Sequence, residues 1–318
     1  MTVTAPLRIG ISSCLLGQEV RFDGGHKRDR FLTDTFGAFV EWVPVCPEVE
    51  AGFGTPREAM RLIDRDGRLR LVTAKTNVDV TEQLDRSAHR RVAKLDSAGL
   101  SGYVLKKDSP SCGVFRVKVY SDHGMPARSG RGLFATALMT RFPHLPVEEE
   151  GRLDDPRLRE NFIERVFAYK RLTDHFSSRW TPGSLVRFHT AHKLVLMAHS
   201  VKAYQDLGRL VAHAKTLSRA DLHDRYVDGF MTALSVVATP RRHVNVLQHI
   251  AGYFKHDLDQ ADRAELHGLI DDYGRGLVPL AVPITLIRHH VRRCAVAYLE
   301  GQVYLDPHPK ELMLRNHV

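Results

Sequence analysis

The stretch RIGISSCLLG, residues 8–17, decides the fold class, because an apolar strand-like run there ends directly in a cysteine. The same arrangement recurs in WVPVCPE, residues 42–48, and in GYVLKKDSPSCG, residues 102–113. Strand-like runs that alternate with helix-like segments over short connections favour an α/β layered domain. In an open, mostly parallel sheet the carboxyl ends of the strands lie along one edge, where such folds bind ligands. We therefore predict that the three cysteines meet in space, although 31 and 65 residues lie between them.

These cysteines are candidates for a metal centre. Three soft thiolate ligands with no fourth beside them indicate a metal with one open coordination position. Buried structural thiols and a zinc site are the alternatives, and the residues alone do not decide among the three. The sequence has no close cysteine pair of the zinc-site type, and a larger iron–sulfur cluster tolerates ligands from separate loops. The candidate ligands are Cys14, Cys46 and Cys112, whereas Cys294 is expected on a helix of another domain.

Length and composition describe an ordinary globular protein. The 318 residues allow two domains, with 43% hydrophobic and 26% charged residues. No apolar run is long enough to span a bilayer, and the first residues lack the basic and apolar regions of a signal peptide. We therefore expect a cytoplasmic protein without a membrane partner, whose thiols stay reduced. The sequence does not indicate an oligomeric state.

The chain changes character near the acidic break at residues 148–151. Strand and helix signals alternate before it, and helix starts with a capping residue followed by proline recur after it, as at Thr181-Pro182 and Thr239-Pro240. We predict an α/β N-terminal domain over residues 1–150, Rossmann-like and layered, with a mostly parallel sheet. An all-α C-terminal domain is expected over residues 151–318.

The positive charge is unevenly distributed. The chain carries a net charge of +9, with 22 Lys and Arg against 19 Asp and Glu in residues 1–150, and 24 against 18 in the remainder. Fourteen of the 18 histidines also lie in the second part. A basic, histidine-rich half points to a polyanion such as nucleic acid. A basic surface without a specific partner remains the alternative.

Several motifs resemble the thiouracil desulfurase family. They are SSCLLG (12–17), VRFDGGHK (20–27), CPE (46–48), GFGTPR (52–57) and KKDSPSCG (106–113). The second half resembles the YbgA-like helical domain that is often fused to this family. The motifs there are HTAHK (189–193), MAHS (197–200) and RHVNVLQH (242–249). The two-domain combination resembles the bacterial desulfidases that remove sulfur from 4-thiouridine in tRNA.

The resemblance implies a 4Fe-4S cluster held by the three cysteines, with the fourth iron free of protein ligands. It implies a non-redox desulfidase that converts 4-thiouridine in tRNA to uridine and releases sulfide. A soft thiocarbonyl sulfur should coordinate an open iron, which withdraws electron density from the ring carbon and favours attack by water. By motif position the catalytic acid/base is Glu48, and Ser109 is a proton relay or a partner of that base.

Further residues are assigned to the substrate. Polar side chains near the cysteines are expected to contact the thiolated nucleobase: Arg21, Asp23, His26, Lys27, Lys107 and Ser111. Lys and Arg of the helical domain are expected to contact tRNA phosphates. The candidates are Lys193, Lys202, Arg209, Arg241, Arg242, Lys255, Arg292 and Arg293. A helix face with His189, His192 and His199 is expected to be core and not a metal site. The rival functions are desulfuration of free thiouracil or thionucleosides, and a non-catalytic iron–sulfur sensor that binds nucleic acid.

Overall fold

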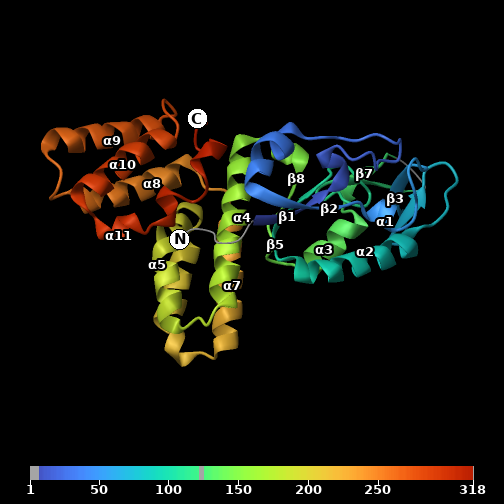
Figure 1. The fold of residues 1–318 in the computed structure, drawn as a ribbon, viewed down its shortest axis with the longest axis horizontal. Coiled ribbons are helices and arrows are strands. Elements are labelled where there is room, and N and C mark those ends of the chain that lie inside the picture. The colour runs from blue at the N-terminus through green and yellow to red at the C-terminus, as the bar shows by residue number, and fades with distance from the viewer. Residues whose placement is uncertain (1–6, 122–124, 318) are drawn as a thin grey trace. The chain divides into compact units, whose positions relative to one another are not determined.

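The computed structural model describes residues 7–121 and 125–317. The chain divides into two compact units, Met1–Asp155 and Pro156–Val318 (Figure 1). We placed the boundary near Gly151, four residues earlier. None of the described helices combines the length and the apolar character needed to cross a membrane.

A four-stranded parallel sheet forms the centre of the first unit. Its strands are β1 (Leu7–Ser12), β2 (Val40–Val45), β5 (Leu100–Leu105) and β8 (Val147–Glu149), in the order β2-β1-β5-β8. All three pairings are parallel. Every residue of β5 is buried, as expected of a central strand covered on both faces. The edge strand β2 contains Pro44, which an edge tolerates because one side of the strand needs no hydrogen bonds. The predicted α/β class with a parallel sheet is confirmed.

Three helices belong to this unit: α1 (Pro47–Glu50), α2 (Thr81–Leu95) and α3 (Leu133–Arg141). Figure 1 shows α2 and α3 side by side along one face of the parallel sheet. The buried face of α2 includes Leu84 and Val92, at the helical spacing read from the sequence.

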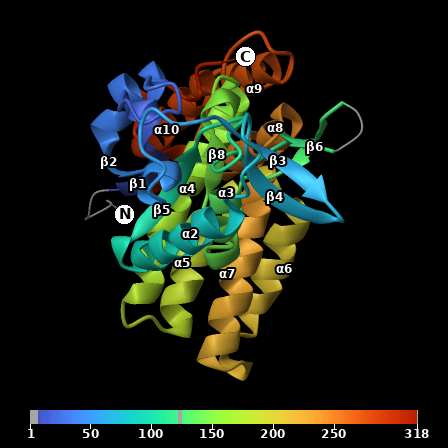
Figure 2. The same cartoon turned by 90° about the vertical axis from the view of Figure 1, so that its right-hand side faces the viewer.

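A second four-stranded sheet was not predicted. It contains β3 (Met60–Arg65), β4 (Arg68–Thr73), β6 (Val117–Tyr120) and β7 (Ala127–Gly130), in the order β4-β3-β6-β7. Only β3 and β6 run parallel. Figure 2 shows β3 and β4 as a hairpin. The sequence pattern predicts strands over residues 69–72 and 114–120. The first forms as β4 and only the second half of the other forms, as β6, whereas β3 and β7 are not predicted.

The first helices of the second unit are α4 (Pro156–Ser177), α5 (Pro182–His199), α6 (Val201–Ala212) and α7 (Arg219–Ser235). In Figure 1, α4, α5 and α7 run side by side. The predicted start of α5 is confirmed: the Thr181 side chain accepts a hydrogen bond from the Ser184 amide and completes a capping box.

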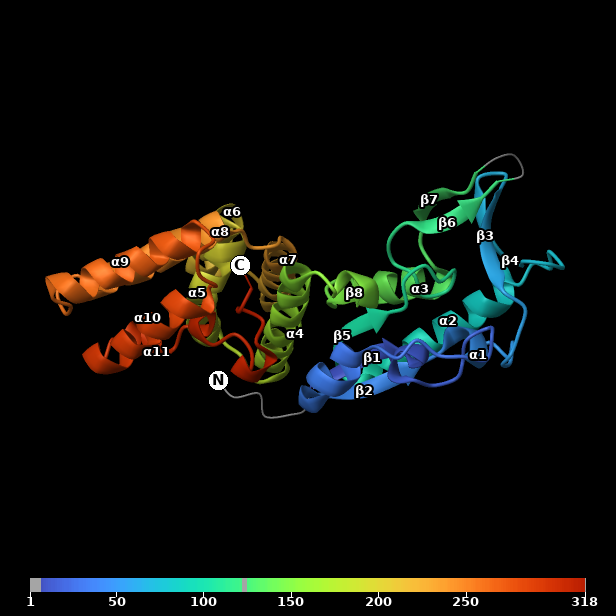
Figure 3. The ribbon, with the colours of Figure 1, turned by 90° about the horizontal axis from the view of Figure 1, so that it is seen from above.

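The remaining helices are α8 (Pro240–Ala251), α9 (Gln260–Gly274), α10 (Ala281–Cys294) and α11 (Ala297–Glu300). Figure 3 shows α8, α9 and α10 as neighbours. The predicted helix start at Thr239-Pro240 is also confirmed, because the Thr239 side chain caps α8. No strand lies among the described residues of this unit, as predicted.

The histidine face of α5 is core. His192 is fully buried, stacks on Phe188 with ring centroids 4.1 Å apart, and hydrogen-bonds through Nδ1 to the Phe188 carbonyl at 2.7 Å. His189 hydrogen-bonds to the Tyr226 hydroxyl at 3.2 Å. His199 contacts the Val236 carbonyl at 2.6 Å and Glu164 at 3.2 Å. Each of these histidines therefore makes a hydrogen bond to a protein group through Nδ1, and His199 makes one through Nε2 as well.

Burial of these histidines predicts acid sensitivity of the helical unit. Burial lowers the pKa of His192 to about 3 and that of His243 to about 4. The folded state therefore favours the neutral rings, so this stability is present above the unfolded pKa near 6.5 and is lost as the pH falls. We expect the free energy of unfolding to drop by up to roughly 1.4 kcal/mol per pH unit for each such histidine below pH 6.5. Urea unfolding between pH 7 and pH 4 measures this slope.

His192→Phe should flatten this pH dependence, because phenylalanine keeps the stacking and has no proton to bind. The exposed His267 provides the control, since His267→Phe should leave the slope as it is in the wild type. An unchanged slope in His192→Phe would show that His192 does not titrate on unfolding.

Candidate functional site

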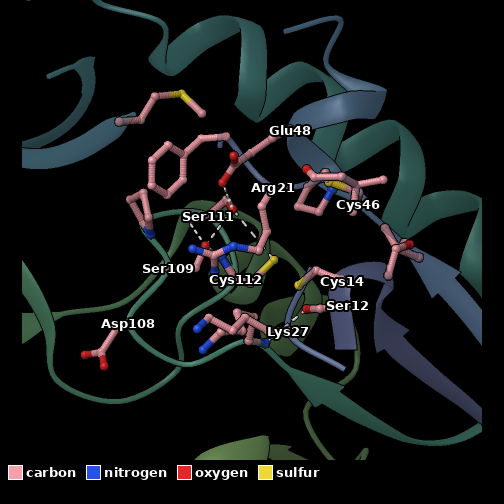
Figure 4. A pocket seen from close by; sticks show the side chains of 18 of the residues that line it. Ser12, Cys14, Arg21, Lys27, Cys46, Glu48, Asp108, Ser109, Ser111 and Cys112 are labelled. Carbon is pink, nitrogen blue, oxygen red and sulfur yellow. Dashed lines mark hydrogen bonds between the residues drawn. The ribbon is translucent and has the colours of Figure 1, made fainter. Parts of the chain in front are cut away.

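A cavity of about 340 Å³ lies at the carboxyl ends of β1, β2 and β5, and all three candidate cysteines line it (Figure 4). Because β1 lies between β2 and β5, the segments that follow these strands emerge next to one another. The predicted convergence of Cys14, Cys46 and Cys112 is confirmed as geometry. The fourth cysteine, Cys294, belongs to α10 of the other unit.

Each thiol is positioned by a short backbone motif. Cys14 lies in a 3-10 turn over Ser13–Leu16, which ends at Gly17 with a φ of 91°. Cys46 directly precedes α1, whose first residue is Pro47. Cys112 lies in the loop after β5, and its amide donates a hydrogen bond of 3.1 Å to the Ser109 hydroxyl.

The three thiols are free and largely buried. Burial raises the pKa of Cys14 to about 11, with a further increase from the neighbouring Cys46. Burial also raises the pKa of Cys46 and, most strongly, that of Cys112. In the chain alone the thiols are therefore protonated at neutral pH, and a bound cation would have to displace their protons.

Glu48 is held at the cavity wall by two partners. Its Oε2 accepts hydrogen bonds from Arg57 Nε at 2.8 Å and Arg57 Nη2 at 2.5 Å, and its Oε1 accepts one from Ser111 Oγ at 2.6 Å. The side chains of Arg57 and Glu48 are only 6% and 13% exposed. A buried carboxylate needs such partners, because desolvation without them costs several kcal/mol. Glu48 thus faces the cavity and does not cap a helix.

Ser109 is placed differently from Ser111. Ser111 contacts Glu48 directly, and its hydroxyl lies 3.6 Å from Cys112 Sγ. Ser109 lies 3.0 Å from the Ser111 hydroxyl and accepts hydrogen bonds from the Ser111 and Cys112 amides. The hydroxyls and the carboxylate form a chain from Ser109 through Ser111 to Glu48. We expected Ser109 to lie beside the base, whereas Ser111 stands between them.

Arg57 was missed as a site residue. It belongs to the GFGTPR motif, which we noted only as part of the family resemblance. Besides Glu48, its Nη1 donates hydrogen bonds to the carbonyls of Val20 at 3.0 Å and Gly54 at 2.8 Å. An arginine nine residues after a carboxylate carries no local signal of pairing, so only the folded loop reveals it.

The acidic residues 148–150 are buried within the first unit and do not mark a solvated linker. Glu150 accepts hydrogen bonds from Lys106 Nζ at 2.5 Å and from the Lys107 amide at 2.7 Å. Glu149 accepts from the amides of Val114 at 2.7 Å and Phe115 at 3.0 Å. These carboxylates therefore fix both ends of the loop that carries Cys112.

Gly132 serves the same loop. A Cβ at this position would lie 2.4 Å from the Ser111 backbone carbonyl, and the Gly132 amide donates to the Gly113 carbonyl at 2.8 Å. The amides of Leu133 and Ala135, in the first turn of α3, donate to the carbonyls of Pro110 and Ser111. The sequence Gly130-Arg131-Gly132 before a helix is compatible with a phosphate site at the helix N-terminus, but the cysteine loop occupies this position.

The expected substrate residues divide into two groups. Arg21, Lys27, Lys107 and Ser111 line the cavity. Asp23 does not line it, because it pairs with Arg21 at 3.2 Å and accepts from the Gly25 amide. His26 does not line it either, and its Nδ1 accepts from the Arg28 amide at 3.2 Å.

The residues expected to contact phosphates also differ in their surroundings: some are paired within the protein and others are exposed. Lys202 and Arg209 share Asp206, at 2.9 and 2.5 Å, and Arg293 pairs with Asp262 at 2.7 Å. Arg242 donates to the His199 carbonyl at 2.8 Å, which ties α8 to the end of α5. Lys193 lies 5.9 Å from the centroid of the Tyr204 ring. Exposed positions are occupied by Arg241, Lys255 and Arg292.

The donor set of the cavity is soft and surrounded by positive charge. Lys106, Lys107, Lys27 and Arg21 share the lining with the thiols. Among residues 7–121 and 125–317, no group of three His, Cys, Asp or Glu side chains is placed to hold one metal ion. The cavity is therefore a ligand site at the strand ends of an α/β sheet. Its lining contains three free thiols, a paired carboxylate and neighbouring cations.

Comparisons with known proteins give the family. The model for 2-thiouracil desulfurase matches residues 9–150, and that for DUF1722, described as a protein of unknown function, matches residues 193–309. The uncharacterized protein YbgA of Escherichia coli K12 is 35% identical over 161 residues, which are 50% of this chain and 95% of YbgA. The uncharacterized protein YbbK of Bacillus subtilis 168 is 38% identical over 112 residues, 32% of this chain and 71% of YbbK.

A solved structure is similar as well. The [4Fe-4S]-dependent thiouracil desulfidase TudS is 34% identical, and the match covers 48% of this chain and 97% of TudS with a TM-score of 0.40. The chain is related both to YbgA and to YbbK, and it joins a 2-thiouracil desulfurase domain to a DUF1722 domain.

Because Glu48 and Arg57 are paired and buried, we expect substitutions at the two positions to have non-additive effects on the free energy of unfolding. Arg57→Met leaves a carboxylate buried without its cation, which should lower the free energy of unfolding by about 3 kcal/mol. Adding Glu48→Gln should recover much of that loss, because an amide needs no counter-charge. Urea unfolding of the single and double variants of the metal-free chain measures the coupling.

The exposed Arg8–Glu41 pair, 42% and 47% exposed, is the control, and Arg8→Met should change stability little. Equal effects of Arg8→Met and Arg57→Met would contradict the structural role of Arg57.

Proposed function

We propose that the chain is an iron–sulfur desulfidase that converts 4-thiouridine in tRNA to uridine and releases sulfide. The observation that carries the proposal is the convergence of three free thiols and a paired carboxylate on one cavity at the strand ends. The match of residues 9–150 to the 2-thiouracil desulfurase model supports the reaction class.

Cys14, Cys46 and Cys112 would hold a 4Fe-4S cluster, as the name of TudS states for that relative. The residues present fit such a group in two respects. The thiols come from three separate loops, which a cluster can span because it is larger than one ion. Lys106 and Arg21 on the same wall lower the pKa of Cys14 and so offset part of the increase caused by burial. When bound, the cluster would supply a soft Lewis acid for the thiocarbonyl sulfur.

Glu48 would act as the base that takes a proton from the attacking water. Arg57 occupies Oε2 with two N–H groups, so Oε1 is the oxygen that remains for proton transfer. Ser111 donates a hydrogen bond to this oxygen. During the reaction water would displace the Ser111 hydroxyl, or the hydroxyl would relay the proton. Ser109 is the next hydroxyl in the chain and would position Ser111. Such proton transfer contributes roughly 100- to 10,000-fold to rates.

The basic helical unit supports a macromolecular substrate. A free thiobase needs only the cavity, whereas residues 151–318 carry 24 Lys and Arg against 18 Asp and Glu. Cations supply the sequence-independent part of RNA binding through phosphate contacts. The exposed Arg241, Lys255 and Arg292 would contribute to it.

The test compares two substrates on the full chain. Protein loaded with iron and sulfide under exclusion of oxygen is given bulk tRNA containing 4-thiouridine or the free nucleoside. Loss of the near-ultraviolet thiocarbonyl band reports the reaction. Much faster loss from tRNA is the expected result. Loss from the small substrate alone would leave the chemistry and refute the tRNA substrate, and loss from neither, with the cluster intact, would favour the sensor.

We expect Glu48→Gln to lower turnover without affecting cluster binding. Glutamine fills the same space but accepts no proton, so kcat should fall at least about 100-fold while the iron content stays at the wild-type level. Stopped assays of product and a colorimetric iron determination measure the two quantities. A matched variant is Glu41→Gln on the surface, which should keep wild-type kcat. Wild-type kcat in Glu48→Gln would remove Glu48 from the mechanism.

A further inference from the structure

Three tyrosines from separate parts of the helical unit lie together at its surface, and we call them the tyrosine cluster: Tyr204, Tyr253 and Tyr298. Tyr253 stacks on Tyr298 with ring centroids 4.9 Å apart and an interplanar angle of 14°. Burial raises the pKa of Tyr298 to about 12, with further increases from Tyr253 and Tyr204. The elements that carry them are α6, the turn after α8, and α11 (Figure 3).

Tyr253 is the exposed member of the cluster. Its side chain is 38% exposed, whereas Tyr204 and Tyr298 pack against the hydrophobic core. Tyr298 supports one face of the Tyr253 ring, and His249 meets it edge-on with centroids 5.6 Å apart. Among the described residues no other ring stacks on Tyr253. An aromatic ring that is supported on one face and open on the other is a surface on which a flat group can stack.

Each tyrosine of the cluster lies near the end of a long stretch without acidic residues, and the residues that directly follow these stretches are Asp206, Asp257 and Glu300. Three stretches of the helical unit, residues 175–205, 229–256 and 273–299, contain no Asp or Glu and eleven Lys or Arg together. All 18 acidic residues of the second half of the chain lie outside them. Each stretch contributes one tyrosine of the cluster. The stacked rings of Tyr253 and Tyr298 therefore join two of these stretches.

Cations lie beside the rings. Lys193 Nζ is 5.9 Å from the centroid of the Tyr204 ring. Gln302 donates hydrogen bonds to the carbonyls of Thr190 and Tyr298, which ties α11 to α5 near this lysine. Lys255 follows Tyr253 by two residues and is exposed. Positive charge next to an open aromatic ring suits a polyanion that also carries flat bases, namely single-stranded nucleic acid.

We propose that the tyrosine cluster is a stacking platform for an unpaired base of an RNA, with Lys193 and Lys255 contacting the adjoining phosphates. The inference rests on the proposed action on tRNA and names the feature by which the helical unit would recognise it. Tyr253 would stack directly on the base, and Tyr298 would support the Tyr253 ring from behind. An acidic protein surface would match the cations but would not use the open ring.

The test is a binding measurement that needs no catalysis. A fluorescent single-stranded oligoadenylate and a blunt RNA duplex of equal length, both without thiolated bases, are titrated with the full chain. Tyr253→Ala should weaken binding of the single strand by about 5- to 100-fold, because base stacking on an aromatic side chain contributes in that range. Binding of the duplex, which offers only its backbone, should change little. Tyr253→Phe keeps the ring and should bind as the wild type does.

The salt dependence separates stacking from charge. The slope of log Kd against log salt should be the same in Tyr253→Ala as in the wild type, whereas Lys255→Ala should reduce it by about one. The unfolding midpoint of each variant shows that the exposed Tyr253 is not needed for folding.

The outcomes are distinct. Equal weakening of single strand and duplex, or no weakening of either, would overturn the platform, and so would the absence of RNA binding by the wild type. Selective weakening by Tyr253→Ala supports it even if the chain then leaves 4-thiouridine in tRNA unchanged, a result that would refute only the proposed function. Desulfuration of tRNA at the wild-type rate and KM by Tyr253→Ala would refute the platform alone.

Discussion

The parallel pairing of β1 with β2 on one side and β5 on the other is the constraint on which the cysteine cavity depends. Because these three strands are neighbours that run in the same direction, the segments after them must emerge at one edge. The pairing itself depends on close packing at Gly10. The Tyr103 ring lies 2.1 Å from the point where a Cβ of Gly10 would be, so only glycine allows β1 and the buried ring to lie so close.

Buried carboxylates hold the loops that follow these strands in place. Glu149 and Glu150 hold backbone amides and Lys106 at the two ends of the Cys112 loop, and Glu48 joins Arg57 to Ser111 across the cavity. Each carboxylate is costly to bury alone, and each is compensated by charge or by several hydrogen bonds. The cavity is therefore shaped by polar contacts on an apolar sheet, which keeps the thiols and the carboxylate in fixed relation.

Local sequence pattern was sufficient for the parallel sheet and for the convergence of the cysteines, because apolar runs and their ends are local features. The second sheet was missed although Asp66-Gly67, both with positive φ, is a two-residue hairpin signal between β3 and β4. Three successive glutamates are usually solvated, so residues 148–150 predict a domain break. Glu148 pairs with the nearby Arg152, whereas the partners of Glu149 and Glu150 lie more than 30 residues away, so only the tertiary structure explains why these two are buried. The same holds for Arg57.

The two units present complementary chemistry. The first concentrates soft sulfur and one paired carboxylate in a cavity, and the second exposes cations and a stacked tyrosine. The most direct test of the cysteine site is the iron and sulfide content per chain after anaerobic reconstitution. We expect about four of each in the wild type and in Cys294→Ala, and a loss in Cys14→Ala, Cys46→Ala and Cys112→Ala. Retention of the cluster in Cys112→Ala, or its loss in Cys294→Ala, would contradict a site built from the ends of β1, β2 and β5.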